Sequence, residues 1–492
     1  MFHVKRPLAI VVMLATLGVA TLACTPGSSA RGWAAPVPMD DDVVIVSTGR
    51  GRLDGVDTST SPDVKWTSRL ASNLAAGDID VSASILGSGA QPFQGDVVQI
   101  GEERMRIKSV EADVCTQRLI LICLQKSGPD VRMALERGFA GTQVADHAAG
   151  AEARGSRRPW RFPNDWNITD RNARSLNGIY GQPVPSSDKT TVFLGDYNGY
   201  LYAFRPGDVN LDATKDEEQP IAASLKLGAS IIGGVTLDTS SNTLYVTSGS
   251  ALYSVSAADM TKRIENRDAP VQRTELFVTG GDIWSTPVID GNRIYFASLD
   301  GNLYAIDKTT GSEVWRYTGT RSLVSTPVLV GSSLLVGGFD NYLHAIDVST
   351  GKERWRFEAS NWVWAAPFVE GGRAYVGDFD GNVHAIDVSD GREVWSKNLS
   401  EKPIVSSPVI ARGVLVVAAQ DGSVFGLDPS TQNQRWEPVR LHTSLDADLV
   451  ASGSNVLLAP TGCVTPPGQE GKLYYIKLDA QNGALSSIRE VC

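Results

Sequence analysis

Two histidines are the first candidates for chemistry, because imidazole is a common ligand for transition metals in proteins. His344 and His384 lie in matching surroundings, and in neighbouring copies of the same sequence pattern their position holds Tyr304 and Phe425. A position that accepts Tyr, His and Phe is typical of a packed aromatic site. We therefore expect both histidines to be structural, and we predict that the chain holds no metal.

Tryptophans are the second group of candidates, since indole rings dominate the energetic centres of binding surfaces. One position of the pattern is held in turn by Trp33, Trp284, Val324, Trp364 and Val405. Trp362 lies two residues before the last of these tryptophans. Two compatible interpretations stay open: the rings fill the centre of the fold, or they form an aromatic binding patch.

The common catalytic signatures do not occur in the sequence. It contains no Gly-x-Ser-x-Gly, no His-Glu-x-x-His and no glycine-rich phosphate loop. Most acidic residues of the repeated pattern fall at turns, and a carboxylate pair for glycoside hydrolysis cannot be identified. We predict a protein that is not an enzyme, with no catalytic residues and no cofactor.

The first 23 residues are typical of an export signal. Lys5 and Arg6 precede a nearly apolar run from Pro7 to Thr21, and small residues then lead to Cys24. Leu22-Ala23-Cys24 resembles a bacterial lipobox, although Thr21 stands where an aliphatic residue is usual. The resemblance implies a lipid on Cys24, a tether over 24–32 and attachment to the cell membrane or outer membrane. The alternative is cleavage nearby, with Cys24 removed and the protein secreted.

Four further cysteines form an even set, which in an oxidising compartment favours disulfides. Proximity in the sequence suggests Cys115–Cys123, and we also predict Cys463–Cys492, which requires the fold to bring its ends together. The formal net charge is −10, and loss of Lys5 and Arg6 with residues 1–23 gives −12. An acidic chain of this kind is repelled by nucleic acid, so no nucleic-acid partner is expected.

Internal repetition is the strongest signal in the sequence. The segment Ser285–Trp315 recurs as Ser325–Trp355, Ala365–Trp395 and Ser406–Trp436, so the tryptophans lie 40, 40 and 41 residues apart. A fixed period in this range indicates a propeller or a solenoid. Short apolar runs divided by Asp-Gly turns predict four antiparallel strands per repeat, and no helical periodicity spans a repeat.

Counting the third strand of each repeat predicts an all-β propeller of eight blades, with seven as the alternative count. These strands are Arg52–Asp57, Tyr200–Phe204, Ala251–Val255, Leu303–Asp307, Leu343–Asp347, Val383–Asp387, Val424–Asp428 and Leu473–Leu478. The propeller is expected over 33–66 and 160–492. Residues 67–159 do not fit the repeat and are predicted to form a β-rich insertion, with strands over 95–101, 105–110 and 119–124.

The spacing of Ala305, Asp307, Gly311, Glu313 and Trp315 resembles the tryptophan-docking motif of PQQ-like quinoprotein propellers, a family that includes BamB-like lipoproteins. Two further full copies end at Trp355 and Trp395, and a reduced copy keeps Asp428 and Trp436. The resemblance implies that these rings lie between blades. Trp66 is the candidate docking residue of the first blade. It also implies that the Trp33, Trp284 and Trp364 position opens onto the mouth of a central funnel.

Three functions compete on this sequence. The first is a non-catalytic scaffold that binds a protein partner at the cell envelope, by analogy with BamB-like lipoproteins. The second is a quinoprotein dehydrogenase that uses PQQ and Ca²⁺, although the chain has no adjacent cysteines and no residue that matches the family's calcium ligands. The third is binding of a carbohydrate or other ligand through Trp33, Trp284, Trp362 and Trp364. We favour the scaffold.

Overall fold

The computed structural model describes residues 34–38, 43–48, 52–57, 66–70, 80–86, 97–100, 103–112, 115–119, 122–126, 130–136, 152–156, 160–162, 178–205, 222–266, 268–441, 444–459 and 474–490. Before residue 178 the described side chains are those of 34–38 and Ile45, and after it those of 222, 474–477 and 486–490 are not described.

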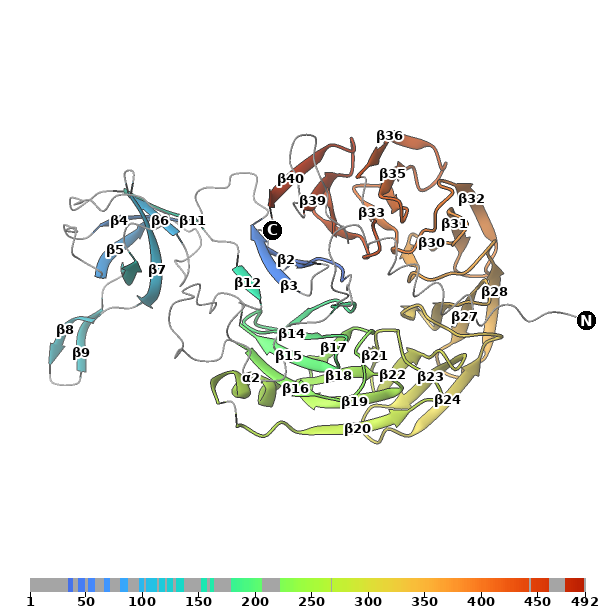
Figure 1. The fold of residues 1–492 in the computed structure, drawn as a ribbon, viewed down its shortest axis with the longest axis horizontal. Helices are drawn as coiled ribbons and strands as arrows, with labels where there is room; N and C mark the ends of the chain where they lie inside the picture. The colour runs from blue at the N-terminus through green and yellow to red at the C-terminus, as the bar shows by residue number, and fades with distance from the viewer. Residues whose placement is uncertain are drawn as a thin grey trace, which may run out of the picture.

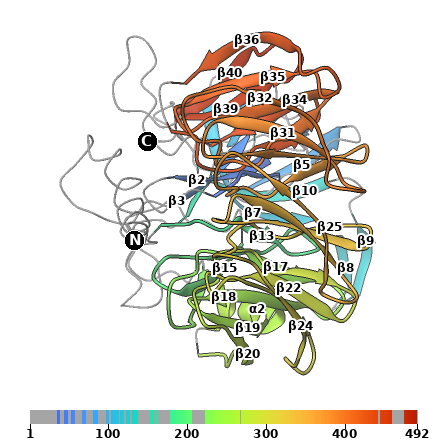
Figure 2. The same ribbon diagram turned by 90° about the vertical axis from the view of Figure 1, so that its right-hand side faces the viewer.

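Eight antiparallel four-stranded sheets form a ring of blades, which Figure 1 shows face-on and Figure 2 from its edge. Seven sheets are each built from four consecutive strands, whereas the first combines β1, β2 and β3 with β12. The last strand, β40, lies beside β3, so the eighth blade meets the first. The structure confirms the predicted all-β propeller, and the eight third strands fall where the repeat places them.

The first blade contains β1 (Val37–Pro38), β2 (Val43–Thr48), β3 (Arg52–Asp57) and β12 (Trp160–Phe162). The second contains β13 (Val184–Pro185), β14 (Val192–Gly195), β15 (Tyr200–Phe204) and β16 (Ala222–Lys226). The third contains β17 (Val235–Asp238), β18 (Thr243–Ser248), β19 (Ala251–Ser256) and β20 (Arg273–Val278). The fourth contains β21 (Val288–Asp290), β22 (Arg293–Ala297), β23 (Asn302–Asp307) and β24 (Glu313–Thr318).

The fifth blade contains β25 (Val328–Val330), β26 (Ser333–Gly337), β27 (Tyr342–Asp347) and β28 (Glu353–Glu358). The sixth contains β29 (Phe368–Glu370), β30 (Arg373–Gly377), β31 (Asn382–Asp387) and β32 (Glu393–Asn398). The seventh contains β33 (Val409–Ala411), β34 (Val414–Ala418), β35 (Ser423–Leu427) and β36 (Gln434–Arg440). The eighth contains β37 (Val450–Ser452), β38 (Asn455–Leu458), β39 (Tyr474–Asp479) and β40 (Leu485–Glu490).

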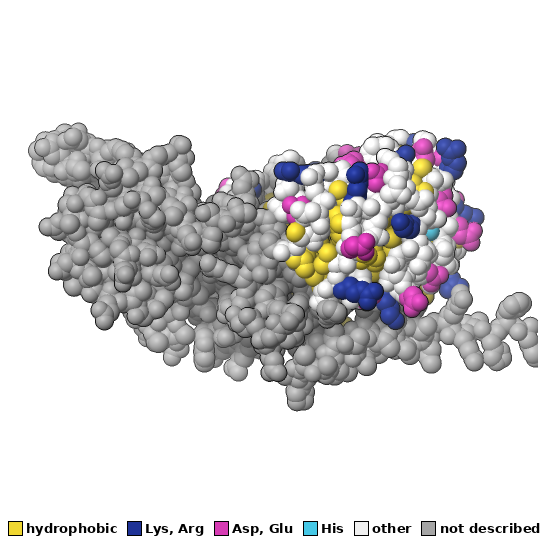
Figure 3. All heavy atoms as spheres, turned by 90° about the horizontal axis from the view of Figure 1, so that it is seen from above, with side chains coloured by type: hydrophobic (Ala, Val, Ile, Leu, Met, Phe, Trp, Pro, Cys, Tyr) yellow, Lys and Arg dark blue, Asp and Glu magenta, His cyan; other side chains and the backbone are white. Residues whose placement is uncertain are grey.

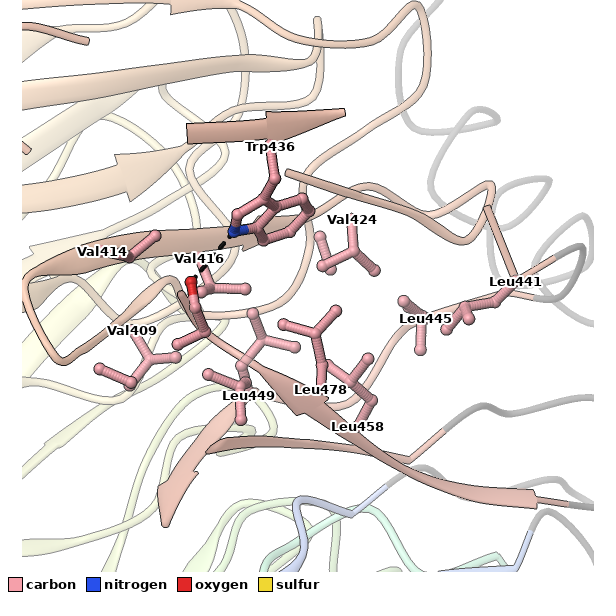
Figure 4. Packing of buried hydrophobic residues seen from close by; sticks show 14 residues of the cluster. Val409, Val414, Val416, Val424, Trp436, Leu441, Leu445, Leu449, Leu458 and Leu478 are labelled. Atoms are coloured by element: carbon pink, nitrogen blue, oxygen red, sulfur yellow. Dashed lines mark hydrogen bonds between the residues drawn. The ribbon is translucent and has the colours of Figure 1, made fainter. Parts of the chain in front are cut away.

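The hydrophobic core lies between neighbouring blades rather than at one centre. The second and third strands of a blade are almost wholly buried, as in β26 and β35, because both of their faces meet adjacent sheets. Between the seventh and eighth blades, Val416 and Val424 face Leu458 and Leu478 across the gap (Figure 4). Burial of apolar surface at each such interface, at roughly 25 cal/mol per Å², is what holds the ring together.

Docking tryptophans connect the fourth, fifth, sixth and seventh blades to the blade that follows each of them. The indole N–H groups of Trp315 and Trp355 donate to the carbonyl oxygens of Val348 and Val388, both at 3.0 Å. Trp395 and Trp436 make the same bond to Pro429 at 3.1 Å and to Ala480 at 3.0 Å. Trp395 and Trp436 are buried. Trp315 and Trp355, which we expected to be buried between blades, are half-buried.

Each part of the docking motif has a physical role in this contact. The motif Asp, for example Asp347, accepts the N–H groups of Ser349 and Thr350 and so fixes the turn that presents the Val348 carbonyl. The small Ala345 is paired with Trp355 across the strands, which leaves room for the indole. In the seventh blade a glycine, Gly426, takes the place of this alanine opposite Trp436.

Among the described residues, one short helix interrupts the all-β pattern, and it was not predicted. Helix α2 (Ala257–Glu265) joins β19 to β20, and Ser256 caps it by accepting the N–H of Asp259 at 3.2 Å. Its buried residues Ala257, Met260 and Ile264 pack against the second blade. Their spacing of three and four residues is helical, but nine residues are too few to stand out from the repeat.

The insertion is a closed, six-stranded barrel with a separate hairpin, and in Figure 1 it stands beside the ring. The barrel contains β4 (Trp66–Leu70), β5 (Asp80–Leu86), β6 (Val97–Ile100), β7 (Glu103–Ala112), β10 (Asp130–Glu136) and β11 (Glu152–Ser156). The hairpin is β8 (Cys115–Leu119) with β9 (Ile122–Lys126). The strand expected over 119–124 was wrong, because the hairpin turn falls inside that range.

The boundary of the first blade also differs from the expectation. Trp66 begins β4, which pairs with β5 and β11 in the barrel, so it does not lie on the fourth strand of the first blade. That place belongs to β12, whose Trp160 pairs with Gly55 of β3. The spacing from Trp33 to Trp66 matched a repeat in length, but the chain enters the insertion one strand earlier.

The described part of the face seen in Figure 3 carries charges of both signs. In the described part of Figure 3, Lys, Arg, Asp and Glu side chains are interspersed, with hydrophobic side chains between them. The large exposed hydrophobic side chains of the described residues are spread over several blades: Tyr197, Val278, Val314, Val394 and Leu485.

Candidate functional site

The segment that leads into the first strand of each blade lines the axis of the ring. In the fourth blade Ser285 is fully buried, whereas Trp284 and Thr286 on either side of it are only partly buried. Side chains of an extended segment alternate between two faces, so Trp284 and Thr286 share the face opposite to the core. We call the Trp284 position of each blade the mouth position and the Thr286 position the axial position.

Hydrogen bonds between blades show that the axial positions are neighbours. The hydroxyl of Thr286 accepts the backbone N–H of Gly234 at 2.9 Å, and the hydroxyl of Thr326 accepts that of Thr286 at 3.0 Å. A side chain from one blade thus binds the backbone of the preceding blade. In the seventh and eighth blades, Asp448 accepts the N–H of Ser407 at 2.6 Å.

Aromatic rings gather at the mouth over the fourth to sixth blades. The rings of Trp284 and Trp364 have centroids 5.8 Å apart, although Val324 occupies the mouth position between them. Phe339 lies 4.7 Å from Trp362 and 5.8 Å from Trp364. Phe379 completes the group at 5.4 Å from Trp362. We call Trp284, Phe339, Trp362, Trp364 and Phe379 the mouth cluster.

The structure therefore brings together three of the four predicted funnel tryptophans, and Trp33 lies outside the described residues. Phe339 and Phe379 were missed. They stand at one repeat position in the turn between second and third strands, next to Asp340 and Asp380. Aligning these turns shows the pair, but sequence alone does not show that the turns reach the mouth.

One buried polar atom of the mouth cluster has no hydrogen-bond partner among the described residues. The indole nitrogen of Trp284 is buried, and no oxygen or nitrogen of the described residues accepts its N–H. An unpaired buried donor costs about 1–3 kcal/mol. The tilted packing of the rings, at 55° between Trp284 and Trp364, compensates through aromatic contact.

The opposite side of the mouth is polar. Asp446 holds the mouth position of the eighth blade, where it accepts hydrogen bonds from the Gln420 amide at 2.9 Å and the Ser444 hydroxyl at 2.6 Å. Asp448 follows at the axial position. The mouth is thus aromatic over the fourth to sixth blades and acidic at the eighth.

The two histidines are buried between carboxylates. His344 lies 3.0 Å from Asp340 through Nε2 and 3.0 Å from Glu353 through Nδ1. Tyr317 of the preceding blade donates to the same Glu353 at 2.5 Å. In the fourth blade the hydroxyl of Tyr304 at this position donates to Asp300 at 2.7 Å. The repeat position that holds Tyr304 and His344 thus supplies a hydrogen-bond partner for the aspartate of the adjacent turn.

His384 uses a different acid for the same purpose. Its Nε2 lies 3.2 Å from Asp378, and its Nδ1 lies 2.8 Å from Glu393. Burial works against protonation, but the bonds to Asp378 and Glu393 outweigh it, so the pKa of His384 is raised. Among the described residues, no group of three His, Cys, Asp or Glu side chains is arranged to hold a metal ion.

The remaining predicted residues are only partly placed. Cys24, Cys463 and Cys492 lie outside the described residues. The backbones of Cys115 and Cys123 are in β8 and β9, where Cys115 pairs with Lys126 and Cys123 with Arg118. The two cysteines are therefore not directly opposite each other, and both disulfides stay predictions. In the described part of the chain, no helix is long and apolar enough to cross a membrane.

A closed ring of four-stranded sheets, several of them joined by docking tryptophans, defines a β-propeller with PQQ-like repeats. A family model described as outer membrane protein assembly factor BamB matches residues 142–317, 269–361, 299–440 and 367–490, which together span well over half of the chain. The chain belongs to this BamB-like family.

Comparison with known proteins adds two solved structures. The computationally designed Ika8 protein is 15% identical, with a TM-score of 0.49, and the match covers 64% of this chain and 86% of that protein. BamB from Moraxella catarrhalis is also 15% identical, with a TM-score of 0.44, and the match covers 62% of this chain and 95% of that protein. No curated protein matches the chain.

Proposed function

We propose that this protein is an exported, non-catalytic scaffold that binds a protein partner at the cell envelope through the mouth of its propeller. Membership of the BamB-like family supports a propeller scaffold. The mouth cluster is the observation that carries the proposal, because partly exposed tryptophans in contact with one another are the side chains most enriched at binding hot spots.

A pull-down from membranes tests this role. Full-length protein that carries Trp284→Ala and Trp364→Ala together should recover the partner at no more than a tenth of the wild-type level. The control is Val314→Ala, which removes an exposed hydrophobic side chain from β24. Equal recovery by the double variant and by the wild type would refute the mouth as the binding surface.

Attachment to a membrane through Cys24 is the second part of the proposal. Nine residues from Cys24 to Gly32 then connect the lipid to the propeller. Fully extended they reach roughly 30 Å, which keeps the ring close to the bilayer. Mass spectrometry of the mature protein should find an N-terminal cysteine with lipid attached. An unmodified N-terminus downstream of Cys24 would show secretion instead.

The mouth cluster does not fit the quinone that many PQQ-like propellers hold. A flat cofactor needs two parallel surfaces with space for a ring between them. Trp284 and Trp364 instead lean on each other at 55°, with centroids 5.8 Å apart. We expect no stoichiometric, calcium-dependent binding of PQQ and no dye reduction with alcohols or aldose sugars. A glycan array, with and without Trp284→Ala and Trp364→Ala, tests carbohydrate binding in the same way.

A further inference from the structure

Asp448 is unlike its counterparts around the axis. The axial position holds Thr286, Thr326, Ala366 and Ser407 in the four preceding blades, so the eighth blade alone among these places a carboxylate there. These four counterparts are partly buried, whereas the Asp448 side chain is exposed. Its described contact is the N–H of Ser407 at 2.6 Å, and among the described residues no Lys or Arg forms an ion pair with it.

The place of Asp448 in the ring gives its carboxylate a different electrostatic environment from that of an exposed residue on the outer rim. Its side chain is exposed to water, yet it stands at the axial position and bonds the backbone of the preceding blade, rather than lying on the outer rim. Desolvation by the neighbouring protein raises the pKa of Asp448, although the hydrogen bond from the Ser407 N–H acts in the opposite direction. A carboxylate in such a place gains more from a cation than one on the open surface, because water screens the pair less.

The charge and the aromatic side chains at the mouth indicate what kind of partner segment would carry such a cation. Among the described residues, no lysine or arginine occupies a mouth or axial position, and the nearby loop residues Arg321 and Lys402 are exposed. The mouth position precedes the axial position in each segment, so the two positions follow each other along the axis. A partner segment that enters from the side of the mouth cluster therefore meets the aromatic rings first. Its tip then reaches Asp448. Both features favour one kind of occupant, which is a segment with a cationic side chain at its tip and an apolar side chain beside it.

We infer that the funnel holds an arginine or lysine side chain of the protein partner on Asp448, while an adjoining apolar side chain of that partner packs on the mouth cluster. This inference rests on the proposed function and specifies the chemistry of the partner segment. Asp446, already hydrogen-bonded to Gln420 and Ser444, adds to the negative potential at the same side.

A pair of matched peptides tests the inference on the full-length protein. The probes are acetyl-Leu-Arg-Leu-amide and its citrulline analogue, which keeps the shape of arginine without its charge. Tryptophan fluorescence should report binding, because the indoles of the mouth cluster are next to the bound leucines. We expect the arginine peptide to bind at least tenfold more tightly than the citrulline peptide.

Substitutions locate the effect. Asp448→Asn keeps an acceptor for the N–H of Ser407 and should weaken binding of the arginine peptide about tenfold, to the level of the citrulline peptide. The control, Asp290→Asn, removes an exposed carboxylate at the end of β21 and should bind as the wild type does. An unchanged near-ultraviolet circular dichroism spectrum shows that both variants fold.

The outcomes separate this inference from the proposed function. If Asp448→Asn binds the arginine peptide as the wild type does, or if neither peptide binds, the inference is overturned. If the pull-down is lost in the Trp284→Ala and Trp364→Ala variant but kept in Asp448→Asn, the scaffold role stands and the inference falls. If both variants keep the partner, both proposals fall.

Discussion

The ring of Trp355 lies over Gly391 of the next blade, and its N–H donates to the carbonyl oxygen of Val388 in the same turn at 3.0 Å. A Cβ at Gly391 would approach Cε3 of the indole to 2.5 Å. The contact repeats as Trp315 over Gly351 and Trp436 over Gly483. At these three interfaces one indole joins neighbouring blades, because its face packs on a turn and its N–H donates to a carbonyl of the same turn.

Removal of a docking tryptophan should destabilise the ring according to how deeply that tryptophan is buried. We expect Trp436→Ala to lower the free energy of unfolding by about 4 kcal/mol and Trp315→Ala by about 3 kcal/mol. The reason for the order is that Trp436 is buried and Trp315 half-buried. Urea denaturation followed by circular dichroism measures both, and a larger loss for Trp315→Ala would contradict the account.

Comparison of Gly391→Ala with Gly413→Ala should separate two costs of an added methyl group, the clash with Trp355 and the strain of the backbone. Gly391 and Gly413 both have positive φ, 75° and 74°, but a Cβ at Gly413 would meet nothing within 4 Å. We expect Gly413→Ala to cost about 1 kcal/mol through strain alone. Gly391→Ala should cost a further 1–3 kcal/mol, roughly the penalty of overpacking.

The same denaturation experiment in a second background checks the cause. If the extra cost is the clash with the indole, it should disappear when Trp355→Ala is also present, because adjacent sites are not additive. An extra cost that persists without the indole would mean that the turn itself, rather than the docking ring, requires glycine.

The seventh blade departs from the glycine rule and offers a stabilising substitution. Gln432 takes the glycine position of the motif at a φ of 58°, and its carbonyl oxygen accepts a hydrogen bond from Lys397 at 3.0 Å. Because that bond uses the backbone, Gln432→Gly keeps it. Relief of the left-handed conformation should exceed the added entropy of the unfolded chain, with a net gain of about 0.5–1 kcal/mol. Gln434→Gly, in strand β36, is the control and should destabilise.

The sequence showed the propeller because its physical determinants are local and repeated. Asp347, Gly351 and Trp355 stand at fixed offsets within one repeat, and each acts on a neighbouring turn or blade in the same way every time. Helix α2 was not predicted, because it occurs in one blade and the repeat pattern therefore does not indicate it. The barrel was recognised only as β-rich, since its strands pair across long separations, such as β11 with β4 and β6.

The candidate site was harder to predict, because it is assembled from different repeats. The common position of Trp284 and Trp364 was visible, but their contact over Val324 depends on how closely the blades approach the axis. Asp448 was missed for a related reason. An aspartate among many turn acids has no local mark, and its place becomes visible only when all eight blades are aligned on the axis.

The last prediction concerns His384, which pairs with the fully buried Asp378. In the seventh blade, Phe425 and Ala419 stand at these two positions. His384→Phe alone leaves the carboxylate without its cation and should cost about 3 kcal/mol near pH 6. His384→Phe with Asp378→Ala reproduces the seventh blade and should recover most of that loss, as a double-mutant cycle would show.

The cost of His384→Phe should depend on pH in a defined direction. The pKa of His384 is raised in the folded protein, so its contribution is complete below the unfolded value of about 6.5 and is lost as pH rises through the folded value. The pKa of Asp378 is lowered, so its contribution is lost only as pH falls below about 3.9. The cost of the variant should therefore be greatest between about pH 4 and 6.5 and shrink toward pH 9.

Tyr304→Phe is the matched control, because it alters the same position of the fourth blade. Burial and the bond to Asp300 raise the pKa of Tyr304 to about 12, so this side chain stays neutral over the whole range. Its substitution should cost the same at every pH from about 5 to 9, since neither state of the tyrosine changes charge there. Urea denaturation of the three proteins at four pH values gives the comparison. A flat profile for His384→Phe would show that the histidine is neutral in the fold.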